Sequence, residues 1–165
     1  MKLLPLQWAA VALIVLDAIV VVSTLMGVPV LASWWNLVLV LASAALLVLL
    51  LVRSGGALRV KGLKTAFRFL RESLPMWAIV LAALAFYGGW LIALGTMVSG
   101  SAAGNLKYEN GQYTSTQRKV VKVLTKEQYE AAQAANQRIF SSIGLAVAGG
   151  VLGFAGVVRR IKETS

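Results

Sequence analysis

Asp17 is the residue whose chemical type and position stand out first in this chain. It lies in the middle of the apolar run 4–26, in which no other side chain carries a charge. An ionised carboxylate at the centre of a bilayer costs at least about 2.5 kcal/mol, so such a group usually faces a cavity, a partner or a bundle interior. Three roles follow: a neutral carboxyl group that makes a structural hydrogen bond, a relay for protons or cations, and a contact with a basic residue of another subunit.

Polar groups at the same membrane depth are the candidate partners of Asp17. Counting residues from the ends of the apolar runs places Ser43, Tyr87 and the pair Gly149-Gly150 at a similar depth. We predict a hydrogen bond between Asp17 and Tyr87. A relay needs a second ionisable group, and the apolar runs offer none, so the structural role is the first expectation. Asn36 lies near the end of its apolar run, where we expect an interface residue rather than a ligand.

Missing residue types exclude several classes of chemistry. The 165 residues include no cysteine and no histidine, which removes disulfides, thiolate nucleophiles, Ser-His-Asp catalysis and nearly all zinc and haem sites. The six acidic residues are spread along the chain, which disfavours a carboxylate metal site. We therefore expect no catalytic, cofactor-binding or metal-binding residues, and a protein that is not an enzyme.

The composition is that of an integral membrane protein. Only 13% of the residues are charged, whereas soluble domains carry about 25%. Four apolar runs are long enough to cross a bilayer: 4–26, 31–52, 74–98 and 139–158. We predict an all-α fold with one membrane domain of four transmembrane helices. A signal peptide is the competing interpretation of the first run, but the run is too long and no clear cleavage site follows it.

Basic residues gather before the first apolar run, between the second and third runs, and after the fourth run. Ten of the sixteen lysines and arginines fall in three short segments beside the runs, and the positive-inside rule places those segments in the cytoplasm. Both termini and the segment 53–73 are then inside, and 99–138 is outside. The inside segments carry a net charge of +8 (ten basic residues minus Glu72 and Glu163), and the outside segment carries +3 (six basic minus three acidic). No nucleic-acid-binding motif accompanies this charge, so we expect no nucleic-acid partner.

The segment 57–72 has the pattern of an amphipathic basic helix. On a helical wheel its apolar side chains share one arc, and its basic side chains share another: Lys61, Lys64, Arg68 and Arg71. We predict that it lies on the cytoplasmic surface of the membrane, with these basic groups near anionic lipids. A solvated linker helix is the alternative.

The segment 99–138 is the one long polar stretch, and we predict that it forms a small external cap. Asn110-Gly111 is the strongest short signal for a β-hairpin with a two-residue type I′ turn. That turn places Tyr108 opposite Tyr113. The valine-rich stretch 119–124 is a candidate third strand.

A helix start follows directly after these strands. Thr125 and Gln128 have the spacing of a capping box, and Leu124 and Tyr129 occupy the positions of a hydrophobic staple. No helix breaker separates them from the last apolar run. We therefore predict one continuous helix from Lys126 to about Arg160.

The last apolar run carries a seam of small residues. Its members recur at intervals of three and four: Ser142, Ala146, Gly149, Gly153 and Gly156. Small residues let helix backbones approach closely in lipid, where the pattern small-xxx-small is common. The seam is explained equally by packing within the four-helix bundle and by an interface with a second copy or a partner.

These features favour a non-enzymatic role. We expect a small multi-pass protein of the bacterial cytoplasmic (inner) membrane, acting as an accessory or assembly subunit of a larger membrane complex through the seam and the cap. Its partners would be the bilayer and either a larger membrane protein or another copy of itself. Two alternatives stay open: a small ion or solute transporter module that uses Asp17, and a membrane immunity or resistance protein whose cap intercepts a toxin.

Overall fold

The four membrane-length helices predicted from the sequence are confirmed. The computed structural model describes residues 3–30, 33–54, 63–109, 111–117 and 120–164. Within them, helices long and apolar enough to cross a bilayer are α1 (Pro5–Thr24), α2 (Ser33–Ser54), α4 (Met76–Val98) and part of α5 (Lys126–Thr164). The described chain is therefore mostly helical, and its four long apolar helices fit a membrane protein.

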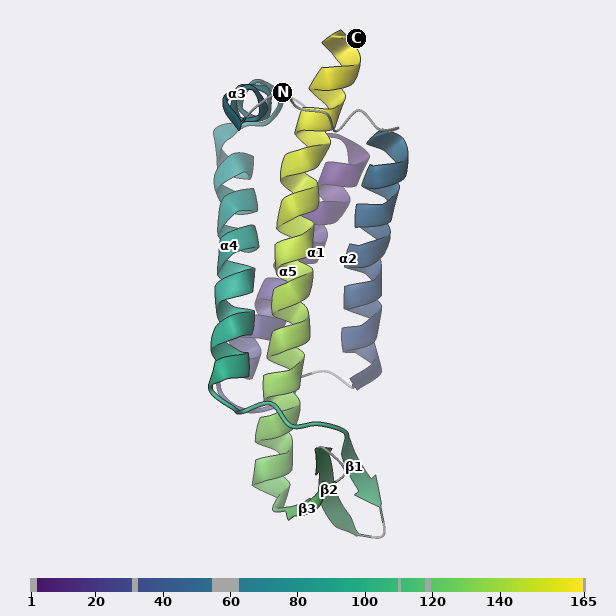
Figure 1. Cartoon of the computed structure of the whole chain (residues 1–165), viewed down its shortest axis with the longest axis vertical. Helices are drawn as coiled ribbons and strands as arrows, with labels where there is room; N and C mark the ends of the chain where they lie inside the picture. The colour runs from purple at the N-terminus through teal and green to yellow at the C-terminus, as the bar shows by residue number, and fades with distance from the viewer. Residues whose placement is uncertain (1–2, 31–32, 55–62, 110, 118–119, 165) are drawn as a thin grey trace.

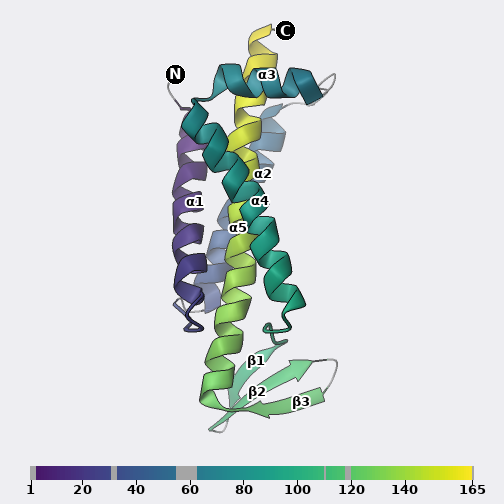
Figure 2. The same ribbon diagram turned by 90° about the vertical axis from the view of Figure 1, so that its left-hand side faces the viewer.

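Helix α5 is the centre of the bundle. Figure 1 shows α4, α1 and α2 arranged around it, and Figure 2 shows α5 running through the whole length of the molecule. In the most apolar stretch of α5, 72% of the residues are buried, against 17% in α2. Small residues of α5 allow close contact with its neighbours, whereas the exposed apolar faces of α1, α2 and α4 suit contact with lipid.

Each outer helix turns a narrow stripe toward α5. In α1 the buried residues follow intervals of three and four from Gln7 through Ile14, Asp17 and Val21 to Thr24. In α4 the stripe is almost entirely alanine, with Gly89 at its middle. This spacing keeps one side of a helix against its neighbour over several turns.

A short helix lies across one end of the bundle. This helix, α3 (Leu63–Ser73), is nearly perpendicular to the bundle in Figure 2, at the end where both chain termini lie. Leu70 reaches the bundle beside Gly153, and Phe67 and Arg68 are exposed. Lys61 and the first part of the predicted segment 57–72 lie outside the described residues, as does the side chain of Lys64.

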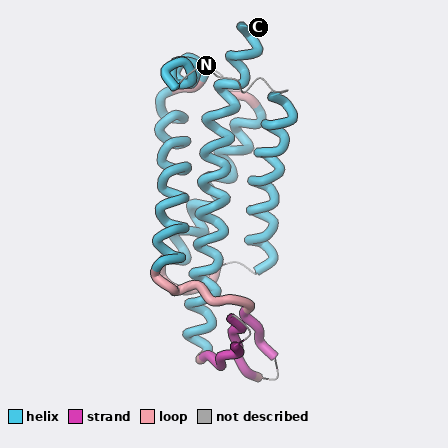
Figure 3. Tube along the Cα trace, viewed as in Figure 1, coloured by secondary structure: helices cyan, strands magenta, loops and turns pink. Residues whose placement is uncertain are grey.

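A three-stranded antiparallel sheet occupies the other end (Figure 3). Its strands are β1 (Leu106–Glu109), β2 (Gln112–Gln117) and β3 (Val120–Leu124), paired in that order. Tyr108 lies opposite Tyr113, and Gly111 adopts a positive φ of 78° in the turn. A positive φ is the conformation that this type of turn requires and that glycine tolerates. Asn110 lies outside the described residues.

The start of α5 is fixed by local hydrogen bonds. The backbone N–H of Gln128 donates to the Thr125 hydroxyl, and the backbone N–H of Thr125 donates to the Gln128 side chain, both at 3.2 Å. This is the reciprocal capping box predicted from the sequence. The ring of Tyr129 lies 5.0 Å from that of Tyr113, which attaches the sheet to the first turns of the helix.

Candidate functional site

Asp17 is buried in the contact between α1 and α5. Its side chain is fully inaccessible to solvent and rests on the backbone of α5 at Gly144. A Cβ atom placed on Gly144 would lie 2.7 Å from Oδ2 of Asp17, so a side chain at that position would collide with the carboxyl group. Gly144 therefore makes the space that the carboxyl group fills.

The polar surroundings of Asp17 are sparse. The hydroxyl group of Ser141 on α5 faces the carboxyl group. Neither carboxyl oxygen makes a hydrogen bond of normal geometry, and no basic side chain forms an ion pair with it, within the described part of the chain. The site is thus a closely packed acid in the bundle interior.

The predicted hydrogen bond between Asp17 and Tyr87 is wrong. Tyr87 is 68% exposed and its ring packs edge-on against Phe86, on the side of α4 that faces away from α5. The α4 residues that do face α5 are Ala82, Ala85 and Gly89. Tyr87 follows Ala85 by two positions, which is a rotation of about 200° around a helix.

The other residues expected at this depth also lie apart from Asp17. Gly149 contacts α4, and Gly150 lies beside the ring of Phe86. Ser43 is buried on α2, and its hydroxyl group has no hydrogen-bond partner among the described residues. Matching residues by depth therefore does not identify which side chains meet, because it takes no account of the rotation of each helix about its axis.

The small-residue seam of α5 packs within the chain. A Cβ atom on Gly149 would lie 2.8 Å from the Ala82 carbonyl oxygen and from the Phe86 amide nitrogen. On the facing helix, a Cβ atom on Gly89 would lie 2.5 Å from the Ser142 carbonyl oxygen and 3.0 Å from the Ala146 side chain. The two backbones touch, as small-xxx-small packing allows.

The same seam continues to the end of the bundle. Gly153 lies against Leu70 of α3, and a Cβ atom on Gly156 would meet Ser73 and Leu74 at 3.1 Å. All five seam residues, from Ser142 to Gly156, therefore lie on the side of α5 that α3 and α4 cover. The seam therefore packs within the four-helix bundle, which is the first of the two explanations that the sequence left open.

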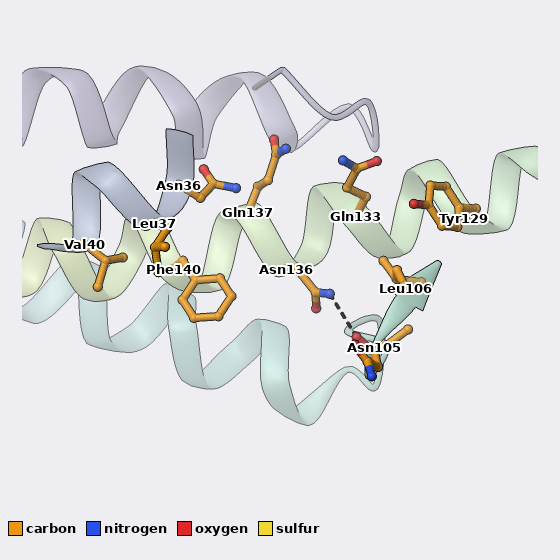
Figure 4. A pocket seen from close by; sticks show the side chains of 11 residues that line it. Asn36, Leu37, Val40, Asn105, Leu106, Tyr129, Gln133, Asn136, Gln137 and Phe140 are labelled. Carbon is orange, nitrogen blue, oxygen red and sulfur yellow. Dashed lines mark hydrogen bonds between the residues drawn. The ribbon is translucent and has the colours of Figure 1, made fainter. Parts of the chain in front are cut away.

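A pocket of about 470 Å³ lies where the bundle meets the sheet (Figure 4). Its walls come from the start of α2, the loop that leads into β1, and the part of α5 between Tyr129 and Phe140. Five of the eleven lining residues are amides: Asn36, Asn105, Gln133, Asn136 and Gln137. This volume is within the range of about 300–1,000 Å³ that is usual for ligand pockets.

Part of the amide set holds the pocket walls in place. The Asn136 side chain donates to the Ala103 carbonyl oxygen at 2.9 Å, and the Gln137 side chain accepts from the Val30 amide at 3.0 Å. Next to them, the Arg138 side chain donates to the Thr24 carbonyl oxygen. These bonds tie the loops after α1 and α4 to α5, so the pocket walls are fixed by hydrogen bonds.

Asn36 differs from the other amides. It is 6% exposed, and its Oδ1 has no hydrogen-bond partner among the described residues. A buried acceptor without a partner costs about 1–3 kcal/mol. Sequence reasoning placed Asn36 at the membrane interface but missed its role in a pocket. The signal was the spacing of Gln133, Asn136 and Gln137, which puts three amides on one side of α5.

The edge strand β3 is a second candidate binding surface. Strand β3 is at the edge of the sheet, and its residues Val120, Val121 and Val123 are 61–67% exposed. Tyr108 is exposed as well, while Ser115 is buried and its hydroxyl group donates to the Gly104 carbonyl oxygen at 2.9 Å. An edge strand presents unpaired main-chain donors and acceptors, here accompanied by exposed valine side chains.

Neither the site chemistry nor comparison with other proteins assigns an activity. No group of three or more acidic residues that could hold a metal ion occurs among the described residues. No protein-family profile matches the chain, and no curated protein or solved structure shows significant similarity to it.

Proposed function

We propose that this chain is a non-enzymatic accessory or assembly subunit of a larger complex in the bacterial cytoplasmic membrane. The observation that carries this proposal is the exposed edge strand β3 with its three exposed valines. An edge strand of this kind can pair with an extended strand of another protein. The small-residue seam is no longer part of the proposal, because α3 and α4 occupy it.

The expected occupant of the β3 edge is an acidic extended segment of a partner protein. The segment 99–138 carries six basic and three acidic residues, a net charge of +3. Three of the basic residues, Arg118, Lys119 and Lys122, belong to β3 or directly precede it. Opposite charges favour pairing across a strand interface, and like charges directly opposite disfavour it. An acidic partner strand therefore suits β3 better than a second copy of β3 paired about Lys122.

The proposal is tested with the full chain purified from its native membrane in mild detergent. Val121→Glu adds a negative charge to the exposed edge without removing a buried contact. We expect the stoichiometric partner to be lost from the purified complex, with the helical content unchanged. Ser101→Glu adds the same charge on the exposed loop before β1 and serves as the control. Retention of the partner by Val121→Glu, or equal loss with Ser101→Glu, rules out the β3 edge as the binding site.

The proposal requires the sheet to lie outside the cytoplasm. Two features support an orientation with both termini inside: the excess of basic residues at the α3 end, and the location of α3 across that end. Single cysteines at Gln112 and Ser165 test it in intact cells with a membrane-impermeant thiol reagent. We expect Gln112→Cys to be labelled and Ser165→Cys to be protected until the cells are opened. The reverse pattern would invert the topology. Gln112 is exposed, so a cysteine there is accessible to the reagent.

A transporter module that uses Asp17 is the second candidate. Its one favourable observation is a buried carboxyl group without a normal hydrogen bond among the described residues. Against it, the carboxyl group fills the space left by Gly144 and leaves no room for a hydrated ion at that contact. Proton or cation flux in liposomes that is abolished by Asp17→Asn would favour this candidate over the accessory subunit.

A further inference from the structure

We propose that the amide-lined pocket binds one uncharged glycolipid, with the sugar headgroup among the amides and an acyl chain along the apolar end of the pocket. This inference is independent of the partner at β3, because it rests on a different surface. It rests on four observations: the level of the pocket relative to the bilayer, its change from apolar to polar along α5, its lack of formal charge, and the orphaned acceptor of Asn36.

The pocket lies at the level of a membrane interface. Trp34 and Trp35 stack on each other at the start of α2, with ring centroids 4.1 Å apart, and both are about half exposed. Indole rings concentrate at the headgroup level of bilayers. Asn36 follows them directly, so the pocket opens where lipid headgroups meet the hydrocarbon.

The pocket changes in character along its length. Leu37, Val40 and Phe140 form the end nearer the membrane interior, and Asn105 and Tyr129 form the end at the sheet (Figure 4). Leu37 and Phe140 are 61% and 50% exposed, so an acyl chain can reach them from the bilayer. The α5 wall from Tyr129 to Phe140 spans about 16 Å at the rise of an α-helix. That length accommodates a headgroup and the first part of a chain.

The polar end suits hydroxyl groups better than a phosphate group. The described side chains that line the pocket are apolar, amide or phenol groups, and none carries a formal charge at neutral pH. Amides donate and accept, as sugar hydroxyls do, so the two can bond in both directions. A phosphate group is an acceptor with a charge, and proteins usually bind it with arginine, lysine or a helix N-terminus.

Asn36 supplies the feature that points to a ligand. Its Oδ1 is buried, lines the pocket and has no hydrogen-bond partner in the described chain. A hydroxyl donor from a ligand would satisfy this acceptor, whereas a phosphate oxygen has no proton to donate at neutral pH. A bare apolar chain would leave the acceptor unsatisfied.

Lipid retention by the full chain tests the proposal. The protein is purified in a polyoxyethylene detergent, which has no sugar headgroup, and is reconstituted in phosphatidylcholine nanodiscs. The discs carry a minor fraction of monoglucosyl diacylglycerol, phosphatidylglycerol or diacylglycerol. Native mass spectrometry then counts the lipids retained after gentle activation. We expect one monoglucosyl diacylglycerol per chain, with much weaker retention of the other two. Octyl glucoside should displace it, and free glucose should not.

Two variants locate the binding site. Asn36→Leu should lower the retention of monoglucosyl diacylglycerol about tenfold, the effect of losing one buried hydrogen bond. Val40→Trp fills the apolar end and should lower retention without removing any polar group. Ser43→Ala, at a buried polar position two turns deeper in α2, is the matched control and should leave retention unchanged.

Each outcome decides the proposal. Equal retention of phosphatidylglycerol shows a site that does not select uncharged headgroups, and overturns it. So does the absence of a retained glucosyl lipid on the folded chain, or retention that neither Asn36→Leu nor Val40→Trp reduces. If Asn36→Leu fails to fold, Val40→Trp alone decides. A pocket filled instead by a co-purifying peptide would appear as a polypeptide adduct, and would also contradict the proposal.

Discussion

The α4 side and the α2 side of α5 are held by different kinds of contact. On the α4 side, glycine and alanine bring two backbones together, and a Cβ atom at Gly89 or Gly149 would meet main-chain atoms at 2.5–2.8 Å. On the α2 side, the buried residues are Asn36, Ser43, Leu50 and Ser54, of which three are polar. The first contact is specified by shape, whereas the second buries few residues, and its Asn36 Oδ1 and Ser43 hydroxyl have no hydrogen-bond partner among the described residues. In a bilayer, close packing and hydrogen bonding replace the hydrophobic effect as the forces between helices.

This difference determines where the fold can tolerate an added or a removed atom. Main-chain atoms at the α4 contact cannot move aside as a side chain can, so added volume has to separate the helices. The α2 contact includes polar atoms without partners among the described residues, at Asn36 and Ser43. Removing one of those atoms removes a cost rather than an interaction.

Gly89→Ala should have the largest effect. Its Cβ atom would lie 2.5 Å from the Ser142 carbonyl oxygen, and we expect a loss of about 3 kcal/mol in the free energy of unfolding, at the upper end for overpacking. Gly88→Ala is the matched control, since a Cβ atom there meets nothing within 4 Å. Unfolding in mixed detergent measures both. Equal stability of the two variants would show that the α4 contact is not limited by shape.

Asp17 lies between these extremes, because its carboxyl group is closely packed yet lacks a normal hydrogen bond among the described residues. Asp17→Asn keeps the size of the group and should change the free energy of unfolding by less than about 0.5 kcal/mol. Asp17→Leu should cost about 1–2 kcal/mol, because it presses a branched side chain against Gly144 and leaves the Ser141 hydroxyl in an apolar site. Loss of folding in Asp17→Asn would mean that the charge itself is required.

Ser43→Ala should have the smallest effect, and it can raise rather than lower the free energy of unfolding. The Ser43 hydroxyl group is buried without a partner in the described chain, so its removal should leave the free energy of unfolding unchanged or slightly higher. The same unfolding assay applies. A loss of more than about 1 kcal/mol would show that the α2 contact depends on a hydrogen bond at Ser43.

The sequence was sufficient for features with local causes. The four apolar helices follow from runs of about twenty apolar residues, and the start of α5 follows from Thr125 and Gln128. Both depend on neighbours within a few residues or on composition along one segment. The continuous α5 likewise follows from the absence of a helix breaker after Lys126.

The contacts between helices depend on rotation about each axis, and there the sequence reasoning failed. Tyr87 was chosen as the partner of Asp17 from its depth, although the stripe of Ala82, Ala85 and Gly89 marks the opposite side of α4 as the packed one. Gly144 was overlooked because it is not part of the seam from Ser142 to Gly156. The pocket was missed because its walls come from three separate segments, and no single segment carries its pattern.

The length of α5 has a mechanical consequence. Its 39 residues rise about 58 Å, whereas the hydrocarbon core of a bilayer is about 30 Å thick. The helix is unbroken from the sheet to the end where α3 lies, so it contains no hinge at which a tilt could be absorbed. Because α5 packs against α1, α2 and α4, a displacement of the sheet would act on all of these contacts together. Tyr129, which contacts the sheet, and Arg159, at the other end of the bundle, belong to this one unbroken helix.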